Sequence, residues 1–418
     1  MTINSEWVKI LKTNATGAFS PKLPSNANIR TVFIDGQIKL MKSNYVQCWN
    51  QFVRLQFINY IEETFSRYGN EICVLGFDNY DYVPEAKGPT QRLRNKTKVQ
   101  FKFEDDTLPT KMPYDWGAAM RNRTFKTKVI AYVIHEVRRH FQKKLTSSKK
   151  TVIIDFKPQL QIFGYVPENN FFKKMQDYCS KEARGECDIK AFDWIHYGPV
   201  LMMSTDGDYI PIALLQQQTD HKNNDIYIHR MAVKCSKGEK RSVQGAKKQE
   251  YEFVNISRLK TELQTKFDHI SLEDLIACIA LSGCDFAMNL PLIGPQKIWN
   301  ILNSKDSPSH LCNVKSIEAL IVEIYAEKFA KSSFLKTQNY TIFVQKIKQI
   351  SKAEKHISML WTQNRLNAHC KNVLWTMQYW KNLSKYPDAL QIDQEGNSVW
   401  GFVKNKNVIV FDGQTLLN

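Results

Sequence analysis

The segment that most constrains the fold is Pro199–Leu215, where a short apolar run leads directly into two closely spaced acidic residues. Val200–Met203 has no polar side chain, and Asp206 and Asp208 follow it. Such a run is typical of a strand buried on both faces of a parallel sheet. Open α/β sheets bind ligands beyond the carboxyl ends of these strands. We therefore predict a buried strand, two carboxylates at the sheet edge and a helix over Ile210–Leu215; a solvated turn is the alternative.

Two further apolar segments also end in an aspartate. Thr31–Ile34 precedes Asp35, and Ile72–Phe77 precedes Asp78. Between them, residues 45–66 carry apolar side chains at three- and four-residue steps, the pattern of an amphipathic helix. Strand, helix and strand at this spacing predict a βαβ unit with parallel neighbouring strands. All four aspartates should then lie at one edge of the sheet.

The charge of the chain indicates a polyanionic partner. The 58 Lys and Arg residues outnumber the 41 Asp and Glu, giving a net charge of +17. Residues 84–150 alone hold seventeen basic residues against six acidic ones, and enter a helical run from Thr124. A basic segment beside an acidic sheet edge is expected where a phosphate backbone passes between them. Nucleic acid is the leading candidate, and a generally solvated charged surface is the alternative.

The cysteines and the hydropathy exclude several classes of protein. Nine cysteines are scattered with no Cys-x-x-Cys pair and no Cys/His pairing at zinc spacing. This favours reduced thiols over a disulfide framework or a zinc site. No signal peptide opens the chain, and no apolar run approaches the length of a membrane span. We expect a soluble intracellular protein without membrane contact, and at 418 residues two or three packed units.

Three more acidic positions lie near predicted helix ends. Glu186 and Asp188 fall where a helix begins, so they also suit the helix dipole. Ser271–Asp274 is a capping-box start for a helix that runs to Gly283, and Asp285 follows it. A tight turn at Gly294–Pro295 then leads into another helix, and the chain beyond residue 303 reads as mostly helical.

The acidic candidates form a set of seven carboxylates, which would repel one another strongly unless cations were bound. Ligands that are all oxygen favour magnesium or manganese, and their number suits a two-metal site for phosphodiester hydrolysis. The set is Asp35, Asp78, Glu186, Asp188, Asp206, Asp208 and Asp285.

In this order, the motifs resemble those of the flap endonuclease / Rad2-XPG superfamily of structure-specific 5′ nucleases. Gly185–Asp188 matches the family's G-E-x-[ED], and Thr205–Asp208 matches its D-x-D. Leu281–Phe286 matches L-G-x-D-Y, and Ile293–Lys297 matches G-I-G-P-K. The resemblance covers residues 1–305 and makes the chain similar to a divergent, viral-like member.

The resemblance implies an α/β fold, with a mostly parallel twisted sheet flanked by helices. A PIN-like 5′ nuclease core would span residues 1–270 and include a basic arch-like insertion at 84–150. A helix–two-turn–helix region that binds duplex would follow at 271–335. A mainly helical C-terminal extension would occupy 336–418.

The resemblance also implies roles for individual residues. One metal ion would be held by Asp35, Asp78 and Asp188, and the second by Asp206, Asp208 and Asp285, with Glu186 acting largely through water. The ions would be two Mg²⁺, with Mn²⁺ able to substitute, and K⁺ would bind at the helix–two-turn–helix turn. Lys87 and Arg92 match the residues that contact the scissile phosphate. Further nucleic-acid contacts are expected at Arg94, Lys96, Lys126, Arg138, Arg139, Lys143, Lys144, Gly294 and Lys297.

The activity that follows from the resemblance is metal-dependent cleavage of DNA at 5′ flaps, nicks or ends, during replication, repair or recombination. The protein would act as a monomer at the site of DNA replication, in the nucleus or in a cytoplasmic or viral compartment. The segment Asn372–Trp380 faintly resembles 5′→3′ exoribonucleases, so an enzyme acting on RNA is one alternative. A catalytically inactive nucleic-acid-binding relative is the other.

The chain departs from the family pattern at three positions. Thr2 replaces the family's N-terminal Gly, which affects how closely that terminus approaches the substrate. Asp188 replaces the usual Glu and is one methylene shorter. Leu292 stands where the first Gly of the duplex-gripping turn is expected. No sliding-clamp-binding box is recognisable near the C-terminus.

Overall fold

The computed structural model describes most of the chain. The described residues are 5–41, 46, 48–78, 103, 107–145, 149–156, 159–164, 186–217, 225–232, 250–284, 287, 289–304, 310–329, 340–348, 360, 362–381, 383, 402–405 and 408–411. The predicted site residues Lys87, Arg92, Arg94, Lys96 and Asp285 lie outside them.

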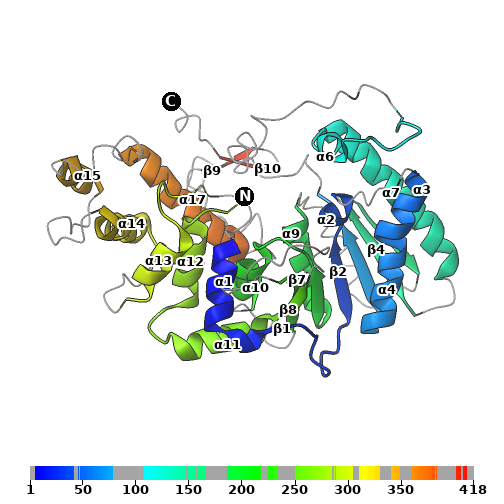
Figure 1. The fold of residues 1–418 in the computed structure, drawn as a ribbon, viewed down its shortest axis with the longest axis horizontal. Coiled ribbons are helices and arrows are strands. Elements are labelled where there is room, and N and C mark those ends of the chain that lie inside the picture. Colours follow the sequence, from blue (N-terminus) through cyan, green and yellow to red (C-terminus); the bar gives the residue numbers. More distant parts are fainter. Residues whose placement is uncertain are drawn as a thin grey trace, which may run out of the picture.

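Among these residues, eight strands form one sheet at the centre of the molecule (Figure 1). Its order is β1 (Phe19–Ser20), β8 (Tyr251–Asn255), β7 (Ile226–Met231), β6 (Val200–Met203), β2 (Thr31–Asp35), β3 (Ile72–Gly76), β4 (Thr151–Phe156) and β5 (Gln159–Gly164). The five strands from β7 to β4 are parallel, whereas β8 and β5 run antiparallel to their inner neighbours. The predicted α/β fold with a mostly parallel sheet is confirmed.

The central strands are buried on both faces, as their unbroken apolar sequences predict. Alternate side chains of β2 enter two different cores: Val32 and Ile34 lie on one face, and Phe33 on the other. β6 divides its residues in the same way, with Met203 on the first face and Met202 on the second. A layer of helices therefore covers each face of the sheet (Figure 1).

The first face is covered by the helices that follow β2 and β3. They are α2 (Gly36–Leu40), α3 (Trp49–Val53), a π-helical turn (Arg54–Ile58), α4 (Asn59–Tyr68), α6 (Trp116–Ala119) and α7 (Arg123–Lys144). The helix predicted over residues 45–66 is thus present, with a π-helical turn in its middle. The rings of Trp49, Trp116 and Phe125 pack together here and join α3, α6 and α7.

Helix α7, which contains the basic helical run predicted within residues 84–150, packs against the core along its whole length. Phe125, Val129, Val133, Val137 and Phe141 of α7 form an apolar stripe and are buried. Burial of this stripe fixes α7 against α3 and β5. Residues 79–102, where the basic segment begins, lie outside the described part of the chain.

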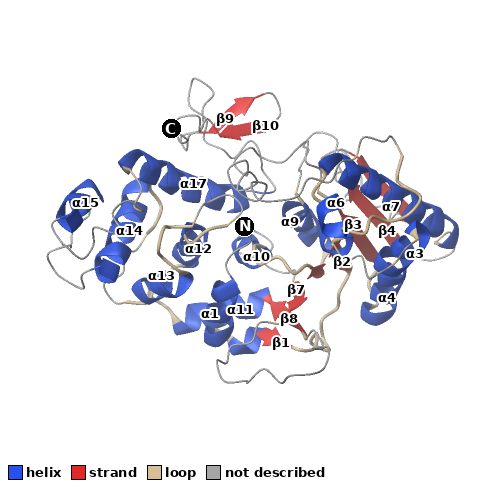
Figure 2. Cartoon of the chain, turned by 45° about the horizontal axis from the view of Figure 1, so that its top comes forward, coloured by secondary structure: helices blue, strands red, loops and turns tan. Residues whose placement is uncertain are grey.

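The second face is covered by a larger helical layer (Figure 2). Its members are α1 (Ser5–Asn14), α9 (Cys187–Lys190) with a 3-10 segment (Ala191–Tyr197), α10 (Tyr209–Gln216), α11 (Ile256–Lys266), α12 (Leu272–Leu281), α13 (Pro295–Leu302), α14 (Val314–Phe329), α15 (Tyr340–Lys348) and α17 (Gln363–Lys381). Ser271 caps α12 by accepting a hydrogen bond from the Asp274 amide, as predicted. A single core runs through this layer, so the regions predicted as 1–270, 271–335 and 336–418 share it.

The remaining described elements are a two-stranded hairpin and two short N-terminal pieces. β9 (Phe402–Asn405) pairs antiparallel with β10 (Val408–Phe411), and a 3-10 turn (Thr16–Ala18) leads into β1. The seven cysteines among the described residues form no disulfide. In the part of the chain described here, no helix is both long and apolar enough to cross a membrane.

Candidate active site

The carboxyl end of β2 carries Asp35 at the centre of the sheet edge. Its carboxylate accepts a hydrogen bond from the Gln37 amide at 3.0 Å, which caps α2, and another from the Ser204 hydroxyl at 3.0 Å. Gly36 follows because a Cβ at this position would lie 2.5 Å from the Gly76 carbonyl oxygen and from the Phe77 ring. The strand can therefore turn into α2 against β3 only with glycine here.

The end of β6 brings the Asp-Gly-Asp segment beside Asp35. The Asp206 amide donates to the Ser204 hydroxyl at 3.1 Å, and the Asp208 amide donates to Asp206 Oδ1 at 3.0 Å. Asp208 is completely buried where α10 begins, whereas Asp206 is partly exposed. β2 and β6 are adjacent although β3 follows β2 in the chain, so the strand order reverses here. This is where open α/β sheets bind ligands.

The end of β3 is connected to α9 by Asp78. Its Oδ1 accepts a hydrogen bond from the Cys187 amide at 2.9 Å. Glu186 occupies the N-cap position of α9, Asp188 lies in its first turn, and both are buried. The start of α9 therefore lies against the same edge of the sheet as the aspartates that follow the strands.

Four of the predicted carboxylates lie near enough to one another to interact electrostatically. The pKa of Asp35 rises to about 7, first because of burial and then because of the charges of Asp78, Asp206 and Asp188. Lys126, near the start of α7, lies at the same edge. Burial lowers the pKa of its ammonium, while Asp78 and Asp35 act in the opposite direction.

The donor set of this edge fits a hard divalent cation, because it consists of carboxylate oxygens whose mutual repulsion a cation would relieve. Within the described residues, no three His, Cys, Asp or Glu side chains are grouped closely enough to hold a metal ion as they stand. Asp285, the seventh predicted ligand, lies outside those residues. The assignment of each carboxylate to a particular ion therefore stays a prediction.

The other predicted basic residues on α7 lie far from the carboxylates. Eighteen residues of helix separate Lys126 from Lys144, a distance of roughly 27 Å along the axis. Lys144 pairs with Glu62 of α4 at 2.5 Å, and Arg139 pairs with Glu136 at 2.6 Å. Arg138 and Lys143 belong to the same half of the helix. Of the α7 candidates, only Lys126 is brought to the acidic edge.

The predicted duplex-binding turn is present before α13. Gly294 is the N-cap residue, Pro295 is the first helical residue, and Lys297 pairs with Glu327 at 2.8 Å. Leu292 has a φ of 63°, a left-handed conformation that glycine adopts much more readily. The turn thus keeps the backbone shape of a glycine position although this chain has leucine there. The potassium site predicted at this turn stays a prediction.

Lys190 is a site residue that the sequence patterns did not identify. Its Nζ donates to the Phe77 carbonyl at 2.6 Å and lies 3.7 Å from Asp155 Oδ1, and both side chains are fully buried. Phe77 immediately precedes Asp78, and Lys190 follows Asp188 by two positions. The ammonium therefore links the ends of β3 and β4 to α9, directly behind the carboxylates.

Two more residues near the carboxylates were missed. Ser204 orients both Asp35 and Asp206, and its only signal in the sequence is its position between the strand and the Asp-Gly-Asp segment. Arg230 is buried in β7. Burial lowers the pKa of its guanidinium, while Glu252 and Asp206 raise it. The sequence offered one signal for Arg230, which is a basic residue inside a predicted strand.

The fold and this site define an α/β protein with a doubly covered sheet and a cluster of acidic side chains where its strand order reverses. No family model matches the chain, and no curated protein sequence matches it. Solved structures do match. The catalytic core of Rad2 in complex with DNA substrate is 12% identical over 90% of this chain and 97% of that one, with a TM-score of 0.41.

Two other solved structures also match the chain. Human GEN1 in complex with Holliday junction DNA is 12% identical over 91% of this chain and 80% of that chain, with a TM-score of 0.35. The T5 D15 protein co-crystallized with metal ions is 13% identical over 87% of this chain and 93% of that chain, also with a TM-score of 0.35.

Proposed function

We propose that this chain is a metal-dependent, structure-specific 5′ nuclease that hydrolyses phosphodiester bonds of DNA at 5′ flaps, nicks or ends. The observation that carries the proposal is the convergence of Asp35, Asp78, Asp188 and Asp206 at the carboxyl edge of the parallel sheet. Carboxylates gathered at such an edge bind divalent cations rather than a neutral substrate. The protein acts in DNA replication, repair or recombination.

In this proposal the carboxylates hold two Mg²⁺ ions. Asp35, Asp78 and Asp188 bind one of them, and Asp206 and Asp208 bind the other. The motif resemblance adds Asp285 to the second ion and assigns Glu186 a contact through water. When bound, two such ions activate the attacking water and stabilise the leaving oxygen in phosphodiester hydrolysis.

The surrounding side chains prepare the site for a phosphate. Ser204 holds the Asp35 carboxylate in place through its hydroxyl. Lys126 adds a positive charge at the edge where the carboxylates meet, so it is placed to bind a phosphate oxygen drawn to that edge. The net charge of +17 favours the approach of a polyanion.

The experiment compares Asp206→Asn and Asp208→Asn with the wild type on a 5′-flap DNA. Both variants should lose cleavage by roughly 100-fold or more in Mg²⁺ while still binding DNA in Ca²⁺, because the carboxylates position cations rather than the DNA backbone. The rise in melting temperature caused by Mg²⁺ or Mn²⁺ should also shrink, which measures cation binding without turnover.

The matched control is Asp268→Asn, since Asp268 has a side chain 94% exposed between α11 and α12. This variant should cleave at the wild-type rate. Near wild-type cleavage by either site variant would mean that the site is misplaced. A parallel assay uses 5′-phosphorylated RNA: faster cleavage of RNA than DNA would assign the chain to exoribonucleases. Binding without cleavage of any substrate would make it an inactive relative.

A further inference from the structure

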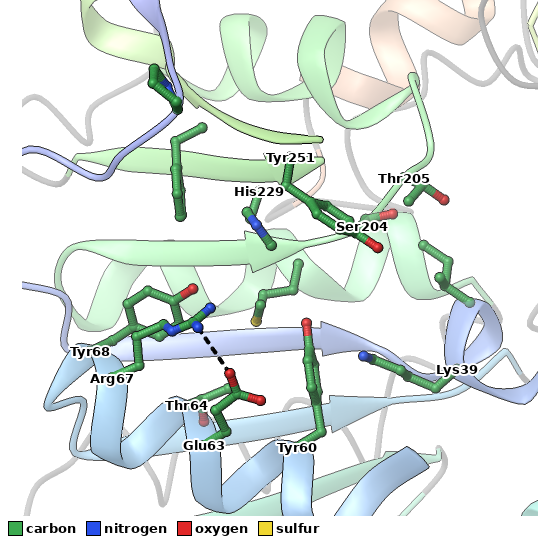
Figure 3. A pocket seen from close by; sticks show the side chains of 14 residues that line it. Lys39, Tyr60, Glu63, Thr64, Arg67, Tyr68, Ser204, Thr205, His229 and Tyr251 are labelled. Carbon is green, nitrogen blue, oxygen red and sulfur yellow. Dashed lines mark ion pairs between the residues drawn. The ribbon is translucent and has the colours of Figure 1, made fainter. Parts of the chain in front are cut away.

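A cavity of about 410 Å³ opens on the sheet beside the carboxylates (Figure 3). Helices α2 and α4 form one wall, and strands β7 and β8 form the other. Ser204 and Thr205, which immediately precede Asp206, line the end nearest the carboxyl edge. The cavity is thus continuous with the candidate active site, although none of the proposed metal ligands lines it. Its volume lies in the range typical of pockets for small organic ligands.

The strand wall of this cavity is an aromatic platform. His229 of β7 stacks on Tyr251 of β8, with ring centroids 5.1 Å apart and an interplanar angle of 25°. It also packs on Phe253 at 4.6 Å. Tyr251 stays 36% exposed, so it is accessible at the mouth of the cavity. Flat aromatic surfaces that keep one face accessible are the usual partners of nucleobases.

The helix wall supplies positive charge. Lys39 of α2 places its ammonium over the Tyr60 ring, and Figure 3 shows both side chains facing His229 and Tyr251 across the cavity. Arg67 of α4 lies in the same wall and is paired with Glu63 at 3.1 Å. Two cations and one carboxylate leave the lining with a positive balance, which favours an anionic group.

The state of His229 is consistent with a positive field in the cavity. Its pKa falls to about 4, first because of burial and then because of the charges of Arg67 and Lys39. The imidazole is therefore neutral at neutral pH and acts as a flat stacking surface. The field that opposes a proton on His229 also favours a phosphate near Lys39 and Arg67.

We infer that this cavity binds one nucleoside monophosphate unit, with its base stacked on Tyr251 and its phosphate beside Lys39 and Arg67. The unit is either a free mononucleotide or one unpaired nucleotide of a nucleic-acid strand, since both present the same ring and phosphate. The inference uses the lining of the cavity alone and holds whether or not the chain cleaves nucleic acid.

The test uses 2-aminopurine deoxyribonucleoside 5′-monophosphate, whose fluorescence is quenched by stacking, in a buffer with EDTA so that no turnover occurs. The wild type should quench the probe saturably. Tyr251→Ala and Arg67→Ala should each weaken binding by about tenfold or more, because they remove a stacking partner or a phosphate partner. Lys39→Gln provides a second test of the phosphate contact. The probe without its phosphate should bind more weakly than the nucleotide.

The matched controls are Ile342→Ala, an exposed apolar residue of α15 outside the cavity, and Arg54→Ala, an exposed arginine on the helical segment before α4. Both should bind like the wild type, and melting temperatures verify that all variants are folded. A second arm places 2-aminopurine at an unpaired position of a DNA strand. Quenching of the free nucleotide identifies a mononucleotide ligand, and Tyr251-dependent quenching only within DNA identifies an unpaired nucleotide. Absence of quenching in both arms, or equal losses in the controls, overturns the inference.

Discussion

The buried ion pair behind the carboxylates allows one prediction to be worked out in detail. In Lys190→Met the ammonium is replaced by an apolar group of similar length. The Asp155 carboxylate, 3.7 Å from Lys190 Nζ and fully buried, then loses its counter-charge, and the Phe77 carbonyl loses a 2.6 Å hydrogen bond from a charged donor. Lys190→Met should therefore be strongly destabilising.

The expected size follows from those two losses. Removing one partner of a buried ion pair costs about 3–5 kcal/mol, and an unsatisfied buried carbonyl costs about 1–3 kcal/mol. Since both losses come from one ammonium they overlap, and we expect a total of about 4 kcal/mol. The double variant Lys190→Met/Asp155→Leu no longer buries a lone charge, so it should regain about 2 kcal/mol of that loss.

The assay is urea-induced unfolding followed by circular dichroism at pH 7 without divalent cations. The control is Lys144→Met, which breaks the exposed pair with Glu62 and should cost less than about 1 kcal/mol. If Lys190→Met stays within about 1 kcal/mol of the wild type, the ammonium does not support the site as described. A double variant as unstable as the sum of its single changes would refute the pairing with Asp155.

Three further predictions concern the site, the pH dependence and the substrate. Gly36→Ala should cost about 2 kcal/mol in urea unfolding because its Cβ would overlap the Gly76 carbonyl. Gly117→Ala should be neutral or gain up to about 1 kcal/mol, because Gly117 is helical and its Cβ would make only ordinary van der Waals contacts. Burial lowers the pKa of His369 to about 4; the unfolded chain then binds the proton more readily, so stability should fall by about 3 kcal/mol from pH 6.5 to pH 4. His369→Gln should lose this contribution and keep that of His229, whose pKa burial also lowers to about 4, and exposed His135→Gln should keep both contributions. A bulky block on the 5′ end of a flap, added before the enzyme, should suppress cleavage, whereas a block added after binding in Ca²⁺ should not. If pre-blocked flaps are cleaved at the same rate as unblocked flaps, the arch predicted for residues 84–150 is contradicted.

The central strands could be predicted from the sequence because parallel strands buried on both faces leave unbroken apolar runs. β2, β3, β4 and β6 were found in this way, together with the aspartates that follow three of them. The edge strands β1 and β5, and β8 next to β1, were not found. Each is exposed along part of its length and so carries mixed side chains that resemble a loop.

The sequence could not predict the packing of α7 or the surroundings of Lys190. The basic residues of α7 drew attention to its solvated face, whereas its position is determined by the apolar stripe that includes Phe125 and Val133. A lysine in a helix is usually exposed, so nothing in the local pattern indicated that Lys190 is buried beside Asp155. Its partners come from strands far away in the chain, and only the tertiary structure brings them together.

The first helix has a consequence for how the chain is made. Trp7 of α1 is fully buried, donates a hydrogen bond to the Ser282 hydroxyl and meets Trp299 edge to face at 6.4 Å. These partners lie more than 270 residues later in the sequence. While the ribosome is still making the middle of the protein, α1 has nothing to cover its tryptophan, and that surface stays available to chaperones. Helix α1 is therefore synthesised long before its partners and is among the last elements to reach its place.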